Sequence, residues 1–237
     1  SGNEITISGA NLNIVSGSGT TDGTVNGLGN LVVGYNETRG SDIRTGSHNL
    51  IVGTRQNFAS YGGLVVGYQN TISGIYSSVS GGNYNTASNS YSSVSGGNNN
   101  TASNTYSSVS GGYGNTASGS YSSISGGSDN TASGYLSSVS GGLSNIPSGN
   151  YSTICGGRAN TATGDWSSIS GGQKNATSSD YSYTSGGYGN TASGAWSSVN
   201  GGWNNTASGE TSTVSGGYNR SAIGTDDWAA GSLWEDN

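Results

Sequence analysis

From Tyr76 onward the chain repeats itself every 15 residues. Ten copies of the pattern Y-S-S-V-S-G-G-x-x-N-T-A-S-G-x, whose residues we number as positions 1 to 15, cover residues 76–225 without insertion or deletion. A Gly pair stands at positions 6 and 7 of every copy, from Gly81-Gly82 to Gly216-Gly217. A fixed period over many copies is typical of solenoids, in which each unit contacts only its neighbours. The repeat therefore restricts the fold to a stack of equivalent units.

The apolar content of the chain is too low for a thick globular core. Leu, Ile, Val and Phe account for 34 of the 237 residues, whereas Gly alone accounts for 45. Disordered chains also have a low apolar content, but they are rich in charged residues and proline as well. Here charged residues make up 8% of the chain and there is one Pro. The combination excludes an ordinary enzyme domain and favours a fold in which stacked, hydrogen-bonded rows replace the core.

The residues of one repeat predict two strands and two corners. A 15-residue unit is too short for the helix pairs of most α-solenoids, and its Ser, Thr, Gly and β-branched residues disfavour helix. The pattern instead divides into a strand (Y-S-S-V-S), a Gly-Gly corner, a second strand (N-T-A-S) and a closing turn. The fold class predicted is all-β, a parallel β-solenoid with 15-residue coils. Coils stacked about 4.7–4.8 Å apart would give a rod of roughly 47 Å for ten copies.

Strand alternation assigns each position to the inside or the outside of the coil. If Val79 points inward, Ser77 does too, and Asn85 and Ala87 point inward from the second strand. The Asn at position 10 is predicted to form a buried structural ladder, each amide bonding to the amides above and below it. That ladder comprises Asn85, Asn100, Asn115, Asn130, Asn145, Asn160, Asn175, Asn190 and Asn205.

Residues 1–75 carry a degenerate version of the repeat. The sequence L-V-V-G or L-I-V-G recurs from Leu31, Leu50 and Leu64, at spacings of 19 and 14 residues. This segment is richer in Leu, Ile and Val than the array. Because solenoids need atypical terminal units to cover their open ends, we expect a more tightly packed domain here that also serves as the N-terminal cap.

Residues 226–237 leave the repeat pattern. The segment contains Trp228, Leu233 and Trp234 beside acidic residues. We expect these apolar side chains to fold over the last coil and to blunt its exposed strand edges as a C-terminal cap. The predicted domain organisation is therefore a terminal domain, the ten-copy array of residues 76–225, and this cap.

The repeats resemble the head domain of trimeric autotransporter adhesins, the YadA-like head. The array S-V-S-G-G-x-x-N-T-A-S-G is preceded by N-L-V-V-G at Asn30 to Gly34 and N-L-I-V-G at Asn49 to Gly53. It is similar also to bacterial surface or secreted proteins with this array behind an N-G-L-G-N segment, here from Asn26. The resemblance covers nearly the whole chain. Its repeat is one residue longer than the commonest head repeat, and neither a coiled-coil stalk nor a membrane anchor is present in the sequence.

The resemblance implies a fold, an assembly and a location. The fold is a left-handed parallel β-roll, and three rolls lie side by side as a homotrimer. Such heads are displayed at the bacterial cell surface or in the extracellular space, where they bind matrix proteins, other cells or surfaces. The resemblance therefore leads us to expect a structural and adhesive head or fibre module, whose ligand is an unidentified extracellular protein or glycan.

Charge and hydropathy exclude two classes of partner. The net charge is −6, and the six basic residues are scattered, so we expect no nucleic acid partner. No apolar run reaches the ~18 residues of a membrane-spanning helix, so we expect no membrane insertion by this chain. The single Cys155 stands at position 5, where we interpret it as a small neutral substitute for Ser that points outward.

Catalytic residues are scarce, and the chain is predicted not to be an enzyme and to hold neither a cofactor nor a metal. The only histidine, His48, is expected to pack or cap in the N-terminal domain. Asp226-Asp227 and Glu235-Asp236 are the adjacent carboxylates, and both pairs fall in the predicted cap. Three further acidic residues share position 15, where other copies hold Ser, Thr, Tyr, Asn or Ala, which indicates solvated surface charge. They are Asp165, Asp180 and Glu210.

Two sets of aromatic residues lie on the predicted surface. Tyr or Trp at position 1 forms a ladder, which we expect to stack on itself or to be buried between subunits. A second, irregular set decorates the Gly-Gly corner and is the candidate binding surface, because aromatic side chains give contact area at low entropic cost. This set comprises Tyr84, Tyr113, Tyr188, Trp203 and Tyr218.

Two alternative functions remain open. Thr at position 11 and Ser at position 13 point outward from the second strand, and such T-x-S rows resemble the T-x-T arrays of ice-binding solenoids. Ile146 and Ala176 interrupt the Thr row. The other alternative is a phage or secreted fibre that binds or processes glycans.

Overall fold

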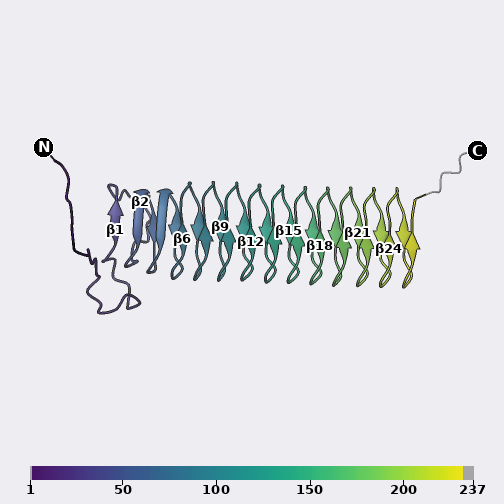
Figure 1. The fold of residues 1–237 in the computed structure, drawn as a ribbon, viewed down its shortest axis with the longest axis horizontal. Coiled ribbons are helices and arrows are strands. Elements are labelled where there is room, and N and C mark those ends of the chain that lie inside the picture. Colours follow the sequence, from purple (N-terminus) through teal and green to yellow (C-terminus); the bar gives the residue numbers. More distant parts are fainter. Residues whose placement is uncertain (1, 232–237) are drawn as a thin grey trace, which may run out of the picture.

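The computed structural model describes residues 2–231, in which every regular element is a β-strand and none is a helix. Figure 1 shows stacked coils in a straight row, with the N-terminal strands (purple) at one end and the C-terminal strands (yellow) at the other. Each coil of the array contributes one strand at positions 3 and 4 and another at positions 11 and 12. The predicted all-β parallel β-solenoid with coils of 15 residues is confirmed.

The first sheet runs the length of the rod. All of its strands are parallel, and within the array each residue pairs with the residue 15 positions further along, as Val109 pairs with Ile124. Its 14 strands are β1 (Leu31–Val33), β2 (Leu50–Thr54), β4 (Leu64–Tyr68), β6 (Ser78–Val79), β8 (Ser93–Val94), β10 (Ser108–Val109), β12 (Ser123–Ile124), β14 (Ser138–Val139), β16 (Thr153–Ile154), β18 (Ser168–Ile169), β20 (Tyr183–Thr184), β22 (Ser198–Val199), β24 (Thr213–Val214) and β26 (Trp228–Ala229).

The opposite side of the coil carries two sheets of six parallel strands. The first contains β3 (Asn57–Phe58), β5 (Thr71–Ile72), β7 (Thr86–Ala87), β9 (Thr101–Ala102), β11 (Thr116–Ala117) and β13 (Thr131–Ala132). The second contains β15 (Ile146–Pro147), β17 (Thr161–Ala162), β19 (Ala176–Thr177), β21 (Thr191–Ala192), β23 (Thr206–Ala207) and β25 (Ser221–Ala222).

The break between these two sheets falls at Pro147. Proline has no N–H, so it cannot donate the ladder bond toward the preceding strand. The coils nevertheless stay in register, because the Thr131 N–H donates to the Asn145 carbonyl at 2.9 Å and the Ser133 N–H donates to the Pro147 carbonyl at 3.0 Å. One missing donor therefore interrupts the ladder without displacing the stack.

The interior of the coil is thin and follows the predicted alternation. Val79 and Ala87 and their equivalents are buried from both sheets. Ser77 is equally buried, and its Oγ donates to the Gly74 carbonyl at 2.8 Å. Each coil therefore needs about two apolar side chains, because the coils above and below cover them.

The Asn ladder is buried as predicted, but its hydrogen bonds differ from those expected. The Asn100 Oδ1 accepts the backbone N–H of Asn115 at 2.9 Å, and its Nδ2 donates to the carbonyls of Gly96 and Gly112 at 3.0 and 2.9 Å. The expectation that each amide bonds to its neighbouring amides was wrong. Among the described residues of this ladder, one direct amide contact is present, from Asn130 Nδ2 to Asn115 Oδ1 at 3.0 Å. Asn thus satisfies the backbone groups that the corner leaves unpaired.

The N-terminal L-V-V-G elements pair in register with one another. Leu31 lies beside Leu50, which lies beside Leu64. Leu64 in turn pairs with Ser78, so the coils that lead into the array are 14 residues long. The degenerate repeat is therefore part of the same stack, as its sequence indicated.

The segment before these strands is less tightly packed than expected. Residues 2–30 contain no strand, and large apolar side chains remain exposed there and in β1, among them Ile5, Leu12, Val15 and Val33. The expectation of dense side-chain packing was wrong for this part of the domain, because most of it lies outside the coil interior (Figure 1).

At the other end, coil stacking continues beyond residue 225. The strand β26 pairs with β24, and Trp228 lies on the outer face with its indole N–H donating to Ser215 Oγ at 2.7 Å. Asp227 accepts the backbone N–H of Ile223 at 3.2 Å and that of Gly224 at 2.6 Å. The other predicted cap residues, Leu233 and Trp234, lie outside the described residues, as does the Glu235-Asp236 pair.

Candidate binding surfaces

A continuous ladder of aromatic rings follows one corner of the rod. Neighbouring ring centroids lie between 3.9 and 6.0 Å apart over its whole length. We call it the stacked ladder, and it comprises Tyr61, Tyr76, Tyr91, Tyr106, Tyr121, Tyr135, Tyr151, Trp166, Tyr181 and Trp196. The expectation that the aromatic residues at position 1 stack on themselves is therefore confirmed, and two rings from outside that position, Tyr61 and Tyr135, join the ladder.

The stacked ladder is continuous although one coil has no aromatic residue at position 1. Leu136 occupies that position in one coil, and the ring is supplied instead by its neighbour at position 15, Tyr135. Tyr135 makes edge contacts with Tyr121 at 5.8 Å and with Tyr151 at 5.5 Å. Sequence analysis by position alone missed this ring, although an aromatic residue directly beside the gap was a visible signal.

Stacking determines what the ladder can offer to a ligand. Most of its pairs are close to parallel, such as Tyr91 and Tyr106 at an interplanar angle of 3° and 4.8 Å. The faces of these rings lie against each other, so solvent reaches mainly ring edges and hydroxyl groups. Trp196, the last ring toward the C-terminus, is the most exposed of the set at 58%. The ladder therefore serves the rod itself and leaves few free ring faces.

Position 1 also has an unusual backbone. Its residues take left-handed conformations, with φ between 54° and 60° from Tyr76 to Thr211. This conformation costs an L-residue roughly 1–2 kcal/mol. Each ring pair contributes about 0.5–1.5 kcal/mol beyond its buried area, which offsets that cost. Nothing in the sequence pattern predicted positive φ at a bulky aromatic residue.

The predicted corner set divides into two groups. Tyr113, Tyr188, Trp203 and Tyr218 occupy position 8, where parallel bridges link successive coils along the corner. Tyr84 occupies position 9, in a left-handed conformation, and its ring packs edge-on to Tyr68 at 5.8 Å. The five residues therefore do not form one row, and four of them share a position.

Three of those four residues lie on consecutive coils. The Tyr188 and Trp203 ring centroids are 5.2 Å apart at 56°, and those of Trp203 and Tyr218 are 6.0 Å apart at 70°. Trp203 and Tyr218 are exposed, whereas Tyr188 is partly buried. Tyr113 lies elsewhere on the rod, between Asn98 and Ser128. The structure thus brings together Tyr188, Trp203 and Tyr218, and separates them from Tyr84 and Tyr113.

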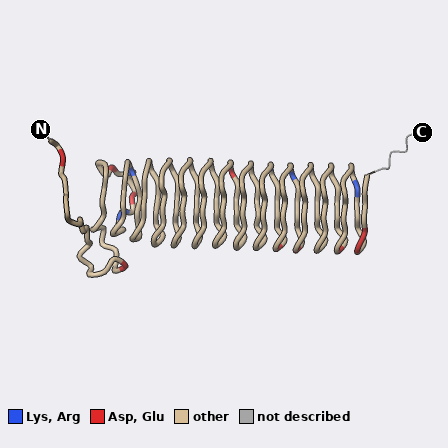
Figure 2. Tube along the Cα trace, viewed as in Figure 1, with Lys and Arg blue, Asp and Glu red and all other residues tan. Residues whose placement is uncertain are grey.

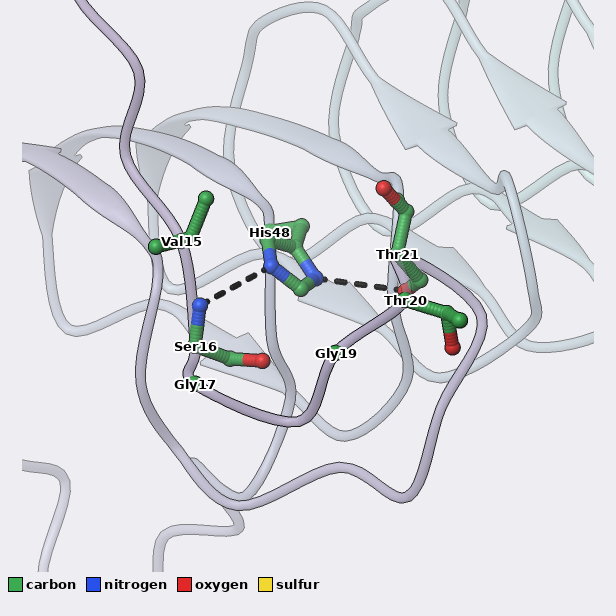
Figure 3. A pocket seen from close by; sticks show the side chains of 7 residues that line it. All are labelled: Val15, Ser16, Gly17, Gly19, Thr20, Thr21 and His48. Atoms are coloured by element: carbon green, nitrogen blue, oxygen red, sulfur yellow. Dashed lines mark hydrogen bonds between the residues drawn. The ribbon is translucent and has the colours of Figure 1, made fainter.

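His48 lines a cavity of about 370 Å³ beside the N-terminal loop (Figure 3). The ring lies between Ser16, whose backbone N–H donates to Nε2 at 3.0 Å, and the Thr21 carbonyl, 3.2 Å from Nδ1. In this arrangement Nε2 accepts a hydrogen bond and Nδ1 donates one, so both ring nitrogens have a partner. His48 therefore anchors the loop, in agreement with its interpretation as a packing residue.

Two of the acidic side chains at position 15, those of Asp165 and Asp180, bond to the backbone of the preceding coil. Asp165 accepts the Asn150 N–H at 2.8 Å, and Asp180 accepts the Asp165 N–H at 3.1 Å. These carboxylates therefore tie neighbouring corners together in addition to carrying surface charge. Within residues 2–231, no three His, Cys, Asp or Glu side chains gather closely enough to hold a metal ion.

Two titratable groups near the start of the rod have shifted pKa values. Burial lowers the pKa of Arg39, while the Asp42 carboxylate acts in the opposite direction. The Arg39 guanidinium donates to the Arg55 carbonyl at 2.6 Å and also to Asn70, so this cation ties three coils together. Desolvation raises the pKa of the Tyr61 phenol at the first ring of the ladder, and Tyr76 adds to the shift. Neither group suggests acid–base chemistry at neutral pH.

The second strands present the predicted Thr and Ser rows. Thr101, Thr116 and Thr131 pair directly with one another across adjacent coils. Their side chains are partly exposed, as are those of the Ser two residues later. Ile146 interrupts the Thr row, but it pairs with Thr161 of the next coil and carries no charge. The result is a regular outer face of hydroxyl and methyl groups.

Comparison with models of protein families and with curated protein sequences finds no match to this chain. Within the described range, no helix has the length and hydropathy to cross a membrane. Proposals about function therefore start from the surfaces of the rod.

Proposed function

We propose that the chain is a structural and adhesive module, a head or fibre segment that presents a rigid repetitive surface to cells, matrix or other surfaces outside the cell. The observation that carries this proposal is the unbroken 14-stranded sheet. It holds similar outer rows in register through the array, so a ligand or neighbour would meet related groups at most coils. A surface of that kind favours many weak, equivalent contacts over a single reaction centre.

The proposed assembly is a homotrimer of left-handed β-rolls, at the bacterial cell surface or secreted. The resemblance to YadA-like heads supports it, and so do the 14-residue coils between Leu50 and Ser78. Exposed apolar side chains near the N-terminus, such as Ile5, Leu12 and Val33, would be buried between neighbouring subunits. Contiguous exposed apolar residues are typical of such interfaces.

Light scattering tests the assembly, and coated beads test adhesion. The expected mass is three times 23.5 kDa, and a stable monomer at micromolar concentration would contradict the trimer. Beads carrying the chain should attach to cells or to matrix-coated surfaces more strongly than beads carrying an unrelated β-solenoid. Equal attachment of both kinds of bead would contradict the adhesive role.

A second candidate function is ice binding, and the outer Thr and Ser face favours it. Its rows are in register, and the residues that interrupt the Thr row, Ile146 and Ala176, carry no charge. Measurement of thermal hysteresis decides this candidate. Thr116→Lys should abolish hysteresis, whereas Ser110→Lys on the outer face of the first sheet should preserve it. Absence of hysteresis in the unaltered chain would eliminate the candidate.

A further inference from the structure

Apart from Asp129, which lies at position 9 on the Gly-Gly corner, the basic and acidic residues of the array lie at different corners. Arg158, Lys174 and Arg220 occupy positions 8, 9 and 10, all at the Gly-Gly corner. Asp165 and Asp180 occupy position 15, at the corner of the stacked ladder, and Glu210 shares that position. Figure 2 shows the basic and acidic residues on opposite edges of the C-terminal half of the rod. Basic groups are thus concentrated on one edge of a chain whose net charge is −6.

The tilted aromatic rings lie on the same edge as these basic groups. Parallel bridges connect Arg158 to Gln173, Gln173 to Tyr188, Tyr188 to Trp203 and Trp203 to Tyr218. These five residues and Lys174 form what we call the corner strip. Five coils at about 4.8 Å per step give a strip roughly 19 Å long. Along the strip, two coils with cationic or amide side chains are therefore followed by three coils with aromatic side chains.

In contrast to most rings of the stacked ladder, Trp203 and Tyr218 of the corner strip are exposed and tilted, whereas Tyr188 is partly buried beneath the Lys174 ammonium. Trp203 is 52% exposed and Tyr218 is 62% exposed, and neither is parallel to its neighbour. The Lys174 ammonium lies 5.6 Å from the centre of the Tyr188 ring and 3.3 Å from its hydroxyl. The ammonium group is thereby held beside the first ring, while its remaining donors face solvent.

From this juxtaposition we infer that the corner strip binds an acidic polysaccharide, lying along the rod axis. Apolar faces of sugar rings pack on Trp203 and Tyr218, and the carboxylates or sulfates of the polymer pair with Arg158 and with the Lys174 ammonium that lies over the Tyr188 ring. A folded protein is a poorer fit, because a standard interface needs about 800 Å² on each partner and the strip is a narrow convex edge. The inference rests on the proposed extracellular adhesive role and gives its ligand class.

Affinity electrophoresis with polymers of defined charge tests the inference. The unaltered chain should be retarded by alginate, a carboxylated polymer, or by chondroitin sulfate, and should migrate freely in neutral dextran. Trp203→Ala should weaken binding by about 30-fold, the effect expected of a central aromatic contact. The double variant Arg158→Gln with Lys174→Gln should weaken it by about 2- to 10-fold, in keeping with exposed ion pairs.

Tyr113→Ala is the matched control. Tyr113 stands at the same repeat position with a similar exposure, but its neighbours along the corner are Asn98 and Ser128 rather than rings. This variant should bind as the unaltered chain does. Equal retardation of Trp203→Ala and Tyr113→Ala would overturn the inference, and so would equal retardation in dextran or none in either acidic polymer.

The bead assay separates this inference from the proposed function. If Trp203→Ala beads still attach to cells or matrix while alginate binding is unchanged, the adhesive role stands and the corner strip is not its site. If no bead attaches but alginate binding is lost in Trp203→Ala, the strip is a polysaccharide site and the adhesive role fails.

Discussion

The two corners of each coil need the same backbone conformation but place different residue types in it. Each contains a residue in the left-handed conformation. At the Gly-Gly corner the second Gly has φ between 77° and 104°, and for Gly82 to Gly202 an added Cβ would come within 2.1–2.3 Å of the next coil's Gly carbonyl. At the other corner the left-handed residue is usually Tyr or Trp, whose side chain projects outward and stacks.

The difference teaches that backbone conformation alone does not decide which residue a corner accepts. What decides it is the space into which Cβ points. At position 7 that space holds the neighbouring backbone and the Asn amide, whereas at position 1 it opens to solvent along a row of rings. A stacked side chain can therefore stabilise a conformation for which glycine is the usual choice.

The largest expected effect comes from adding a methyl group at the Gly-Gly corner. In Gly127→Ala the new Cβ would lie 2.2 Å from the Gly142 carbonyl oxygen at a positive φ. Overpacking against backbone together with left-handed strain should lower the free energy of unfolding by about 3–5 kcal/mol. Chemical denaturation followed by circular dichroism measures the change.

Gly126→Ala is the control for that variant. An added Cβ at Gly126 meets nothing within 4 Å, and its φ is not positive, so the expected change is within about 0.5 kcal/mol. If the two alanine variants are equally stable, the first corner does not depend on close approach between coils, and the contrast between the corners fails.

A smaller effect is expected at the aromatic corner. Tyr106 stacks on Tyr91 and Tyr121 at 4.8 Å on each side, so Tyr106→Ala removes two ring pairs and should cost about 1–3 kcal/mol. Tyr106→Gly removes the same two ring pairs, but it also relieves the strain of an L-residue at positive φ. The glycine variant should therefore be more stable than the alanine variant by about 1 kcal/mol. Thermal and chemical unfolding compare the variants.

Tyr113→Ala provides the reference for an exposed tyrosine without flanking rings along its corner, and should cost less than about 0.5 kcal/mol. A loss as large as that of Tyr106→Ala would show that simple burial of tyrosine, rather than stacking, stabilises the corner.

The smallest effect is a gain in stability. Ala159 at position 9 has φ of 54°, and Gly114 and Gly189 hold the same position in other coils. Ala159→Gly should raise the free energy of unfolding by about 0.5–1 kcal/mol, because it removes left-handed strain. Ala195→Gly, at a residue without positive φ, should lower it by a similar amount. Losses at both positions would mean that position 9 is not strained.

The candidate surfaces were predictable only in part. Outward aromatic residues at the Gly-Gly corner were visible in the sequence, but their division was not. Tyr84 and Tyr113 differ by one repeat position. Because of this difference, Tyr84 has a left-handed backbone conformation and its ring packs against Tyr68. Likewise, the place of Tyr135 in the stacked ladder depends on the reach of its ring across the corner, which periodicity does not encode.

The sequence by itself determined the stack. A constant period, alternation of small and branched residues, and a Gly pair in every copy suffice to predict coils, inward faces and the buried Asn row, because each coil repeats the environment of the one before. Only the tertiary structure decided how those rows interact. Ring tilt, the hydrogen-bond partners of the Asn amides and the space beside each Cβ depend on distances between neighbouring coils, and these distances arise only when the coils are stacked.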